Sequence, residues 1–313
     1  MLFRSGYIGL LGLVGKAGAG CDPTADSGTI PTRQKYWNPS EVSMRLVECY
    51  TDYKSRFTTW ATNNGYKVAD LTDTELMQWI VSRVTDGLNE AKLRHIWFGD
   101  TDAANVDDDG VVTDGVDVKY LNAIDGIWKQ LFAIVTGDNT RKSASIAKNA
   151  GNSYANQKFN STDTTNKVVH GYLQACIDDA DLRLSDAPDK VFYVTKSVFD
   201  QYKKELKNYT SIEAAYQLVQ DGSRQLMFDG VPVIPLSFWD RHIKAYFDNG
   251  TTTDNPHRIL LTTKANLMVG IESEEAINGL DVFYDKVKKN NITDALFTLD
   301  AKVSLDYMVQ LAY

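Results

Sequence analysis

The most regular pattern of hydrophobic and polar positions lies between residues 73 and 98. Thr72 and Glu75 form a capping box, in which two side chains accept the free backbone N–H groups at a helix start. Behind it, positions on one face recur at helical spacing until Gly99: Leu76, Ile80, Val84, Leu88, Ala91 and His95. The pattern predicts a helix over about 73–98, far longer than the ~12-residue average. Gly87 weakens it by roughly 1 kcal/mol relative to Ala, so packing must hold it.

Two stretches alternate with the period of a β-strand. Residues 42–49 alternate behind Pro39, which predicts a strand that starts near that proline. Near the end of the chain, polar residues alternate with Val303, Leu305, Tyr307, Val309 and Leu311. The second pattern predicts one continuous, half-buried antiparallel strand.

The dipeptide Asp229-Gly230 predicts a β-hairpin. It stands between Leu226-Met-Phe and Val231-Pro-Val, and both of its residues tolerate the positive φ that a tight turn requires. Pro232 and Pro235 place the second strand at a sheet edge, because proline has no N–H to donate. Weaker patterns predict further helices at 168–184, 197–206, 212–219 and 238–247, and strands at 191–194, 259–262 and 267–271.

Composition and net charge argue against several classes of function. The chain has 313 residues, 43% of them hydrophobic and 24% charged, which suits a folded protein of roughly two domains. A net charge of −8 without a basic stripe argues against a nucleic-acid-binding surface. The three cysteines, Cys21, Cys49 and Cys176, have no spacing typical of disulfides or zinc sites. No hydrophobic run approaches the ~18 residues of a membrane span.

The best candidate for metal chemistry is an acidic loop. Asn105, Asp107 and Asp109, followed by Gly110, match the first half of an EF-hand calcium loop. The position that should supply a bidentate Glu is Val116, so affinity for calcium should be poor. A solvated acidic loop is therefore the default interpretation, and we assign no metal site.

No other motif supports catalysis. The glycine-rich segment 12–20 fails as a phosphate loop, because Ala17 stands where Ser or Thr should follow Lys16. The four histidines are scattered, and no nucleophile has a motif partner. We assign no catalytic residue and no cofactor, and we expect no enzyme.

The glycine-rich residues 1–34 have no helical period and predict an extended arm or long β-loop. An alternative is a lipoprotein signal ending at Cys21, which would make the protein a secreted or lipid-anchored bacterial surface protein. Lys16 interrupts the hydrophobic stretch, and Gly18 stands where the lipidation signal has Leu. The arm is the better interpretation.

The order of these elements and the amino-acid sequences of several segments resemble those of a known protein family. The segments are Phe98-Gly-Asp100, residues 226–235 with Gly230-Val-Pro-Val233, residues 257–272 with Asn266-Leu-Met-Val-Gly-Ile-Glu272, and residues 300–313. Together they resemble the Hong Kong 97-like major capsid protein of tailed double-stranded DNA bacteriophages, over nearly the whole chain. An encapsulin-type nanocompartment shell protein, which shares the fold, is the nearest alternative.

The resemblance implies an α+β capsid fold. Residues 1–36 would form an N-terminal arm and extended loop, residues 37–134 a peripheral domain with the long helix as its spine, and residues 135–278 an axial domain. Residues 279–313 would return as terminal strands to the peripheral domain. Contacts between subunits are expected at Gly6 to Ile30 and at the Asp229-Gly230 hairpin.

The implied function is structural. The protein would self-assemble into hexamers and pentamers of an icosahedral head, which encloses phage DNA without binding it specifically. Portal, scaffold or decoration proteins are further implied partners, and no membrane is involved. The implied location is the virion capsid, assembled in the cytoplasm of the host bacterium.

Overall fold

The computed structural model describes residues 4–8, 32–49, 59, 62–63, 75–207, 216–218, 224–272, 279–285 and 290–313. The chain divides into two units, Met1–Asn38 and Pro39–Tyr313. In the first unit, β1 (Arg4–Ile8) pairs antiparallel with β2 (Thr32–Tyr36). The segment with the phosphate-loop and lipidation patterns, and most of the predicted arm, lie outside the described residues.

The second unit contains the predicted long helix. It is α2 (Glu75–Phe98), with 24 residues. Gly99 ends it, and its N–H donates to the carbonyl of His95 at 3.1 Å. Val84 and Leu88 are buried as the pattern predicted, whereas Thr72 of the capping box lies outside the described residues.

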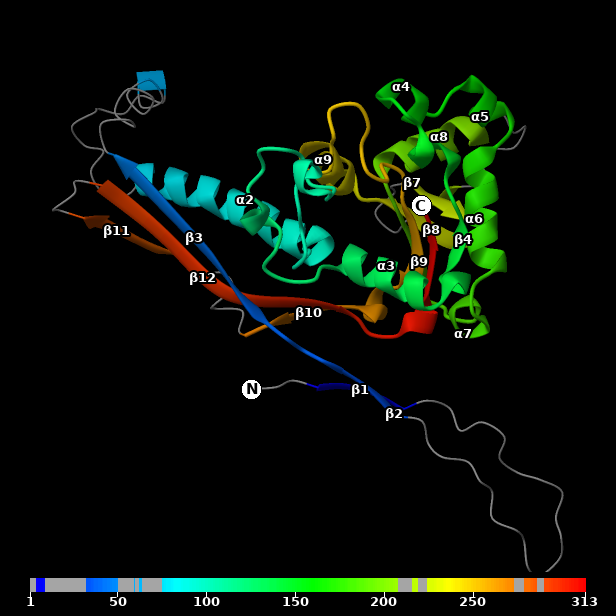
Figure 1. Ribbon diagram of the computed structural model, residues 1–313, viewed down its shortest axis with the longest axis horizontal. Helices are drawn as coiled ribbons and strands as arrows, with labels where there is room; N and C mark the ends of the chain where they lie inside the picture. Colours follow the sequence, from blue (N-terminus) through cyan, green and yellow to red (C-terminus); the bar gives the residue numbers. More distant parts are fainter. Residues whose placement is uncertain are drawn as a thin grey trace, which may run out of the picture. The chain divides into compact units, whose positions relative to one another are not determined.

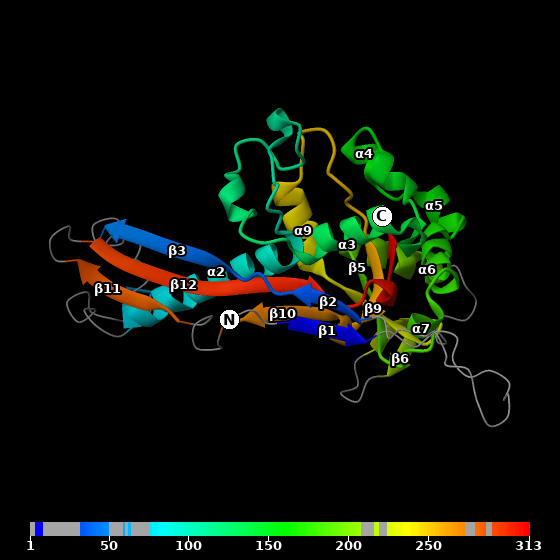
Figure 2. The ribbon, with the colours of Figure 1, turned by 60° about the horizontal axis from the view of Figure 1, so that its bottom comes forward.

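A four-stranded sheet lies beside this helix (Figure 1). Its strands are β3 (Ser40–Cys49), β10 (Leu267–Ile271), β11 (Asp281–Asp285) and β12 (Asn290–Val303). The long strand β12 is central: β3 pairs along one edge, and β10 and β11 pair along the other (Figure 2). All of these pairings are antiparallel.

A seven-stranded sheet forms the rest of the β-structure in this unit. In spatial order its strands are β4 (Lys142–Ala144), β13 (Val309–Ala312), β9 (Ile259–Thr263), β5 (Lys190–Val194), β8 (Val231–Pro235), β7 (Arg224–Phe228) and β6 (Tyr216–Leu218). The predicted hairpin is confirmed at β7 and β8, where Asp229 and Gly230 have φ of 47° and 75°.

Shorter helices follow α2 in this unit. They are α3 (Ile127–Gly137), α4 (Tyr154–Gln157), α5 (Ser161–Thr165), α6 (Val168–Asp178), α7 (Leu182–Ser185), α8 (Lys196–Leu206) and α9 (Ser237–Tyr246). Among them, α3, α6 and α8 contact the sheets. Among described residues, one hydrophobic cluster joins α2, α3 and α9 to β12, and another joins α6 and α8 to the seven-stranded sheet. Trp239 links the helices of the first cluster, with ring centroids 4.8 Å from Trp97 and 4.9 Å from Trp128.

The prediction of one continuous strand at the C-terminus is wrong. The strand β12 ends at Val303, a 3₁₀ turn covers Asp306–Met308, and β13 then begins in the other sheet. Buried Asn266 explains the break, because its side chain accepts from the N–H of Leu305 at 2.6 Å and donates to the carbonyl of Leu305 at 3.1 Å. These bonds satisfy the backbone where the chain leaves one sheet for the other.

Three further predictions need correction. The helix expected at 212–219 is wrong, because Tyr216–Leu218 is the strand β6 paired with β7. The helix expected at 168–184 is two helices, since the carboxylate of Asp181 accepts the N–H of Arg183 and starts α7. The strand β8 is internal, because it pairs with both β5 and β7. Its prolines are tolerated because Pro232 precedes the residues that pair with β5 and Pro235 ends them.

Candidate assembly surface

The four-stranded sheet presents one face to the helices and one face outward. Along β12, Ala295, Phe297 and Leu299 are buried in the cluster that contains the long helix. Successive strand residues point to opposite faces, so Asp294 and Leu296 point outward. Leu296 is 60% exposed, in agreement with this alternation.

An apolar row crosses the outward face. Register places Val47 of β3 opposite Ile292 of β12, and Ile292 opposite Phe283 of β11, so the three residues share a face. Val47 is 50% exposed and Phe283 is 47% exposed. This row forms an exposed hydrophobic patch, the kind of surface that marks an interaction site. Leu296 lies on the same face, on the other side of Asp294 from Ile292.

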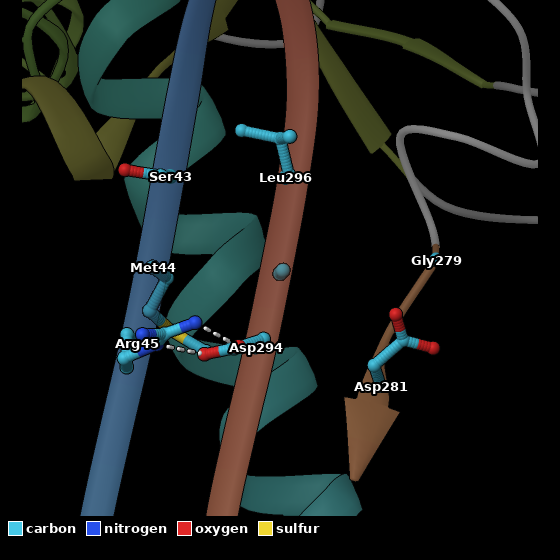
Figure 3. Close-up of a pocket in the computed structure, with 8 residues that line it drawn as sticks. Ser43, Met44, Arg45, Gly279, Asp281, Asp294 and Leu296 are labelled. Carbon is cyan, nitrogen blue, oxygen red and sulfur yellow. Dashed lines mark hydrogen bonds and ion pairs between the residues drawn. The ribbon is translucent and has the colours of Figure 1, made fainter.

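A charged row lies next to the apolar one. Arg45 donates to both carboxylate oxygens of Asp294, from Nε at 2.7 Å and from Nη2 at 2.6 Å. This bidentate pair raises the pKa of Arg45 and lowers the pKa of Asp294. Asp281 is opposite Asp294 on β11, and Figure 3 shows it without a contact to the other residues drawn. Two carboxylates in one row repel each other, which favours a cationic group from outside.

These rows border a surface hollow of about 650 Å³. Its lining combines outward side chains of β3, β12 and β11 (Figure 3): Ser43, Arg45, Asp281, Asp294 and Leu296, with Met44, Gly279 and Ala295. The floor is therefore part apolar and part charged. We call the outward face of β3, β12 and β11 the outer sheet face. Its chemistry suits an apolar segment that carries a positive charge.

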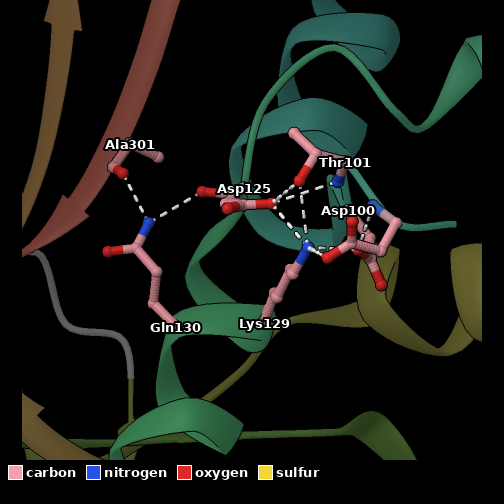
Figure 4. Close-up of polar contacts among 7 residues, drawn as sticks. Asp100, Thr101, Asp125, Lys129, Gln130 and Ala301 are labelled. Carbon is pink, nitrogen blue, oxygen red and sulfur yellow. Dashed lines mark hydrogen bonds and ion pairs between the residues drawn. The ribbon is translucent and has the colours of Figure 1, made fainter. Parts of the chain in front are cut away.

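The junction of α2 and α3 supports the inner side of the same sheet. Lys129 Nζ lies 2.6 Å from carboxylate oxygens of Asp100 and Asp102, and 2.9 Å from Asp125 (Figure 4). The neighbouring Gln130 Nε2 donates to the carbonyls of Asp125 and Ala301 at 2.7 and 2.6 Å, which ties α3 to β12.

Charge interactions set the protonation of this junction. Burial alone would lower the pKa of Lys129, but hydrogen bonds to Asp100, Asp102 and Asp125 raise it above its usual value. Burial would raise the pKa of Asp125, but hydrogen bonds from Lys129 and Thr101 outweigh it and lower the pKa. At neutral pH Lys129 is therefore an ammonium and Asp125 a carboxylate.

The substitution Lys129→Met is expected to lower the free energy of unfolding by about 1–2 kcal/mol at pH 7, because three carboxylates lose their cation. The pKa of Asp125 is lower in the folded state than in the unfolded state. Its contribution to the free energy of unfolding is therefore present above its unfolded pKa of ~3.9, and it is lost as the pH falls through its folded pKa. Urea unfolding at pH 7 and at pH 3 should show a gap between variant and parent that closes in acid. A gap of equal size at both pH values would contradict this.

The predicted calcium loop is closed by its own hydrogen bonds. Asn105 Nδ2 donates to the carbonyls of Thr113 and Val116 at 2.9 and 3.0 Å, so its amide fastens the loop instead of facing an ion. Asp107 and Asp109 are exposed. Within the described ranges, no group of three or more His, Cys, Asp or Glu side chains is arranged to hold a metal ion.

One pair has the residue types of a catalytic dyad, which the sequence motifs did not reveal. Ser197 Oγ lies 2.7 Å from His257 Nδ1, beside a second hollow, and His257 Nε2 lies 2.6 Å from the carbonyl of Gln157. That carbonyl requires the proton on Nε2, so the hydroxyl donates to Nδ1. The backbone N–H groups of Lys196 and Ser197, which could stabilise an oxyanion, both donate to the carboxylate of Asp240. The bonds to Asp240 connect α8 to α9, and the Ser197–His257 bond connects α8 to the segment before β9.

The fold is shared with phage capsid structures. A chain from the satellite phage P4 procapsid that includes the size determination protein matches 99% of this chain and 88% of its own length, with TM-score 0.52 and 9% identity. A chain from Gordonia phage Cozz matches 99% and 80%, with TM-score 0.52 and 10% identity. A chain from Mycobacterium phage Ogopogo matches 100% and 86%, with TM-score 0.50 and 8% identity.

The likeness is one of structure. The chain has the α+β, Hong Kong 97-like capsid fold, as its sequence resemblance implied. No family model matches the sequence. No curated protein matches it either. Within the described part of the chain, every helix is too short or too polar to cross a membrane.

Proposed function

We propose that the protein is the major capsid subunit of a tailed bacteriophage, which self-assembles into hexamers and pentamers of an icosahedral head. The observation that carries this proposal is that the likeness to phage particle chains extends over 99% or more of the sequence. A shared fold does not by itself fix a function, so the proposal also requires a surface suited to assembly.

The outer sheet face supports the proposal. It exposes an apolar patch, a charged row and a hollow, although its inner side is packed against a full helical layer. Neighbouring subunits would cover this face in the assembled shell.

The domain assignment forms part of the proposal. The long helix with the four-stranded sheet would belong to the peripheral domain, and the seven-stranded sheet with its helices to the axial domain. This changes the predicted bounds at two strands, because β10 lies in the four-stranded sheet and β13 lies in the seven-stranded sheet. The Asp229-Gly230 hairpin and the N-terminal arm would contact other subunits. Phage DNA would be enclosed without specific binding, in agreement with the net charge of −8. The particle would assemble in the host cytoplasm and join portal and scaffold or decoration proteins.

Size-exclusion chromatography and negative-stain electron microscopy of the expressed protein test the proposal. We expect closed shells, or rings of five and six subunits. Shells isolated from the native source should contain DNA, whereas a nanocompartment shell would contain protein cargo. A protein that stays monomeric at all concentrations, with or without phage scaffold, would contradict the proposed function.

Replacing Val47, Phe283 and Leu296 together by Ser should abolish shells and leave the subunit folded. These side chains are about half exposed or more in the subunit, so their loss changes its own stability little. The readouts are particle yield by sedimentation and subunit unfolding by circular dichroism. Leu182→Ser, at a residue 80% exposed on α7, is the matched control and should assemble. If the triple variant formed normal shells, the outer sheet face would not be an assembly contact.

A further inference from the structure

The strand β3 is a long edge strand. It has ten residues, and within the described ranges β12 is its only partner strand. An edge strand exposes a row of backbone N–H and C=O groups that can pair with another chain, and long exposed edges are usually blocked. Glu41, Ser43, Arg45 and Val47 are all exposed along it. Among the described residues, the second edge of β3 has no strand paired to it.

The sequence of β3 is complementary to itself in one antiparallel register. With Ser43 opposite Ser43 of a second copy, Glu41 lies opposite Arg45 and Val42 lies opposite Met44. Each pairing then occurs twice, as two-fold symmetry requires. In an antiparallel pair, opposite residues share a face, so the two Glu–Arg pairs gain from direct contact. A register centred on Arg45 would instead place two arginines opposite each other.

Arg45 has the donors for a second carboxylate. It uses Nε and Nη2 on Asp294, which leaves the N–H groups of Nη1. Its side chain is 69% exposed, so a carboxylate from another chain can reach it. The bond to Asp294 also fixes the guanidinium in advance, which reduces the entropy lost when a partner binds.

We propose that β3 pairs antiparallel with β3 of a second copy of this chain, about a two-fold axis at Ser43. The contact rests on the proposed self-assembly, because its partner is another shell subunit. It joins two four-stranded sheets into one continuous sheet and brings their outer faces side by side. The strand edge, and not only the outer sheet face, then determines how neighbouring subunits are oriented.

Cysteine cross-linking tests the register. In a background with Cys21, Cys49 and Cys176 replaced by Ala, Ser43→Cys alone should give a disulfide-linked dimer on mild oxidation of the assembled particle. Glu41→Cys alone and Arg45→Cys alone should stay monomeric, and an assembled mixture of the two should give the dimer. Non-reducing gel electrophoresis distinguishes these results.

The other outcomes separate this contact from the proposed function. Cross-linking of Ser43→Cys with Arg45→Cys, but not with itself, would overturn the register. Intact shells with no cross-link from any of these variants would overturn the contact and leave the capsid function standing. If no variant and no parent protein assembles, the proposed function fails first.

Charge exchange provides a second, independent measurement. Glu41→Arg and Arg45→Glu should each weaken subunit association, by roughly tenfold for two lost pairs. The triple variant with Asp294→Arg added restores opposite charges both between the two copies and within each sheet, and it should recover most of the loss. Analytical ultracentrifugation gives the association constants. A triple variant as weak as the worse single variant would overturn the Glu41–Arg45 pairing.

Discussion

Gly126→Ala is expected to lower the free energy of unfolding by about 2–3 kcal/mol, through a steric clash between two backbone segments. A Cβ at Gly126 would lie 2.6 Å from the backbone nitrogen of Gly99 and 2.8 Å from the carbonyl oxygen of His95. Neither atom can rotate away, and the N–H of Gly126 already donates to the carbonyl of Gly99 at 2.8 Å. Separation of the segments would pull the end of α2 from the start of α3. Urea unfolding of the subunit measures the loss.

Gly87→Ala is the matched control, since it adds the same methyl group within the α2 helix. A Cβ there meets nothing within 4 Å, and Gly87 is exposed. Alanine should therefore stabilise the protein by about 0.5–1 kcal/mol, through lower backbone entropy in the unfolded chain. If both variants had the same stability, the close contact at Gly126 would not be a constraint.

The sequence analysis succeeded where the determining interactions are local. The 3.6-residue spacing predicted α2, and the Asp229-Gly230 turn predicted the β7–β8 hairpin, because both signals lie within one element. The break between β12 and β13 was missed, because it depends on Asn266, which lies far from Leu305 in the sequence. Alternation alone cannot show that a strand changes sheets.

The outer sheet face was not predicted, for a similar reason. Its rows exist only through the register of β3, β11 and β12, and Arg45 and Asp294 are separated by 249 positions. One signal was available: Ile292, Asp294 and Leu296 alternate with buried neighbours along β12. This alternation indicates a strand with one buried face and one exposed face, but it does not show which strands pair with it. The contacts predicted at Gly6 to Ile30 stay a prediction, because most of that segment lies outside the described residues.

Arg258→Ala is expected to cost about 3–5 kcal/mol, because it removes a buried cation and leaves its partners unsatisfied. The side chain is 2% exposed, and burial lowers the pKa of its guanidinium to about 10. The guanidinium lies over the ring faces of Trp128, Phe132 and Phe98, at 4.8, 5.3 and 5.5 Å. Ring faces attract a cation, and here they partly replace the water lost on burial.

The position of Arg258 explains why the loss should spread beyond one cavity. Its Nε donates to the carbonyl of Asn255 at 2.9 Å, and it lies directly before β9 of the seven-stranded sheet. The rings above it belong to α2 and α3, so one side chain connects the long helix to the other sheet. Arg241→Ala is the matched control: that arginine is 63% exposed and pairs with Glu90 at 2.7 Å, so its loss should cost less than about 1 kcal/mol. Thermal unfolding of both variants should show a large decrease in melting temperature only for Arg258→Ala. Equal decreases would mean that the aromatic site does not stabilise its cation.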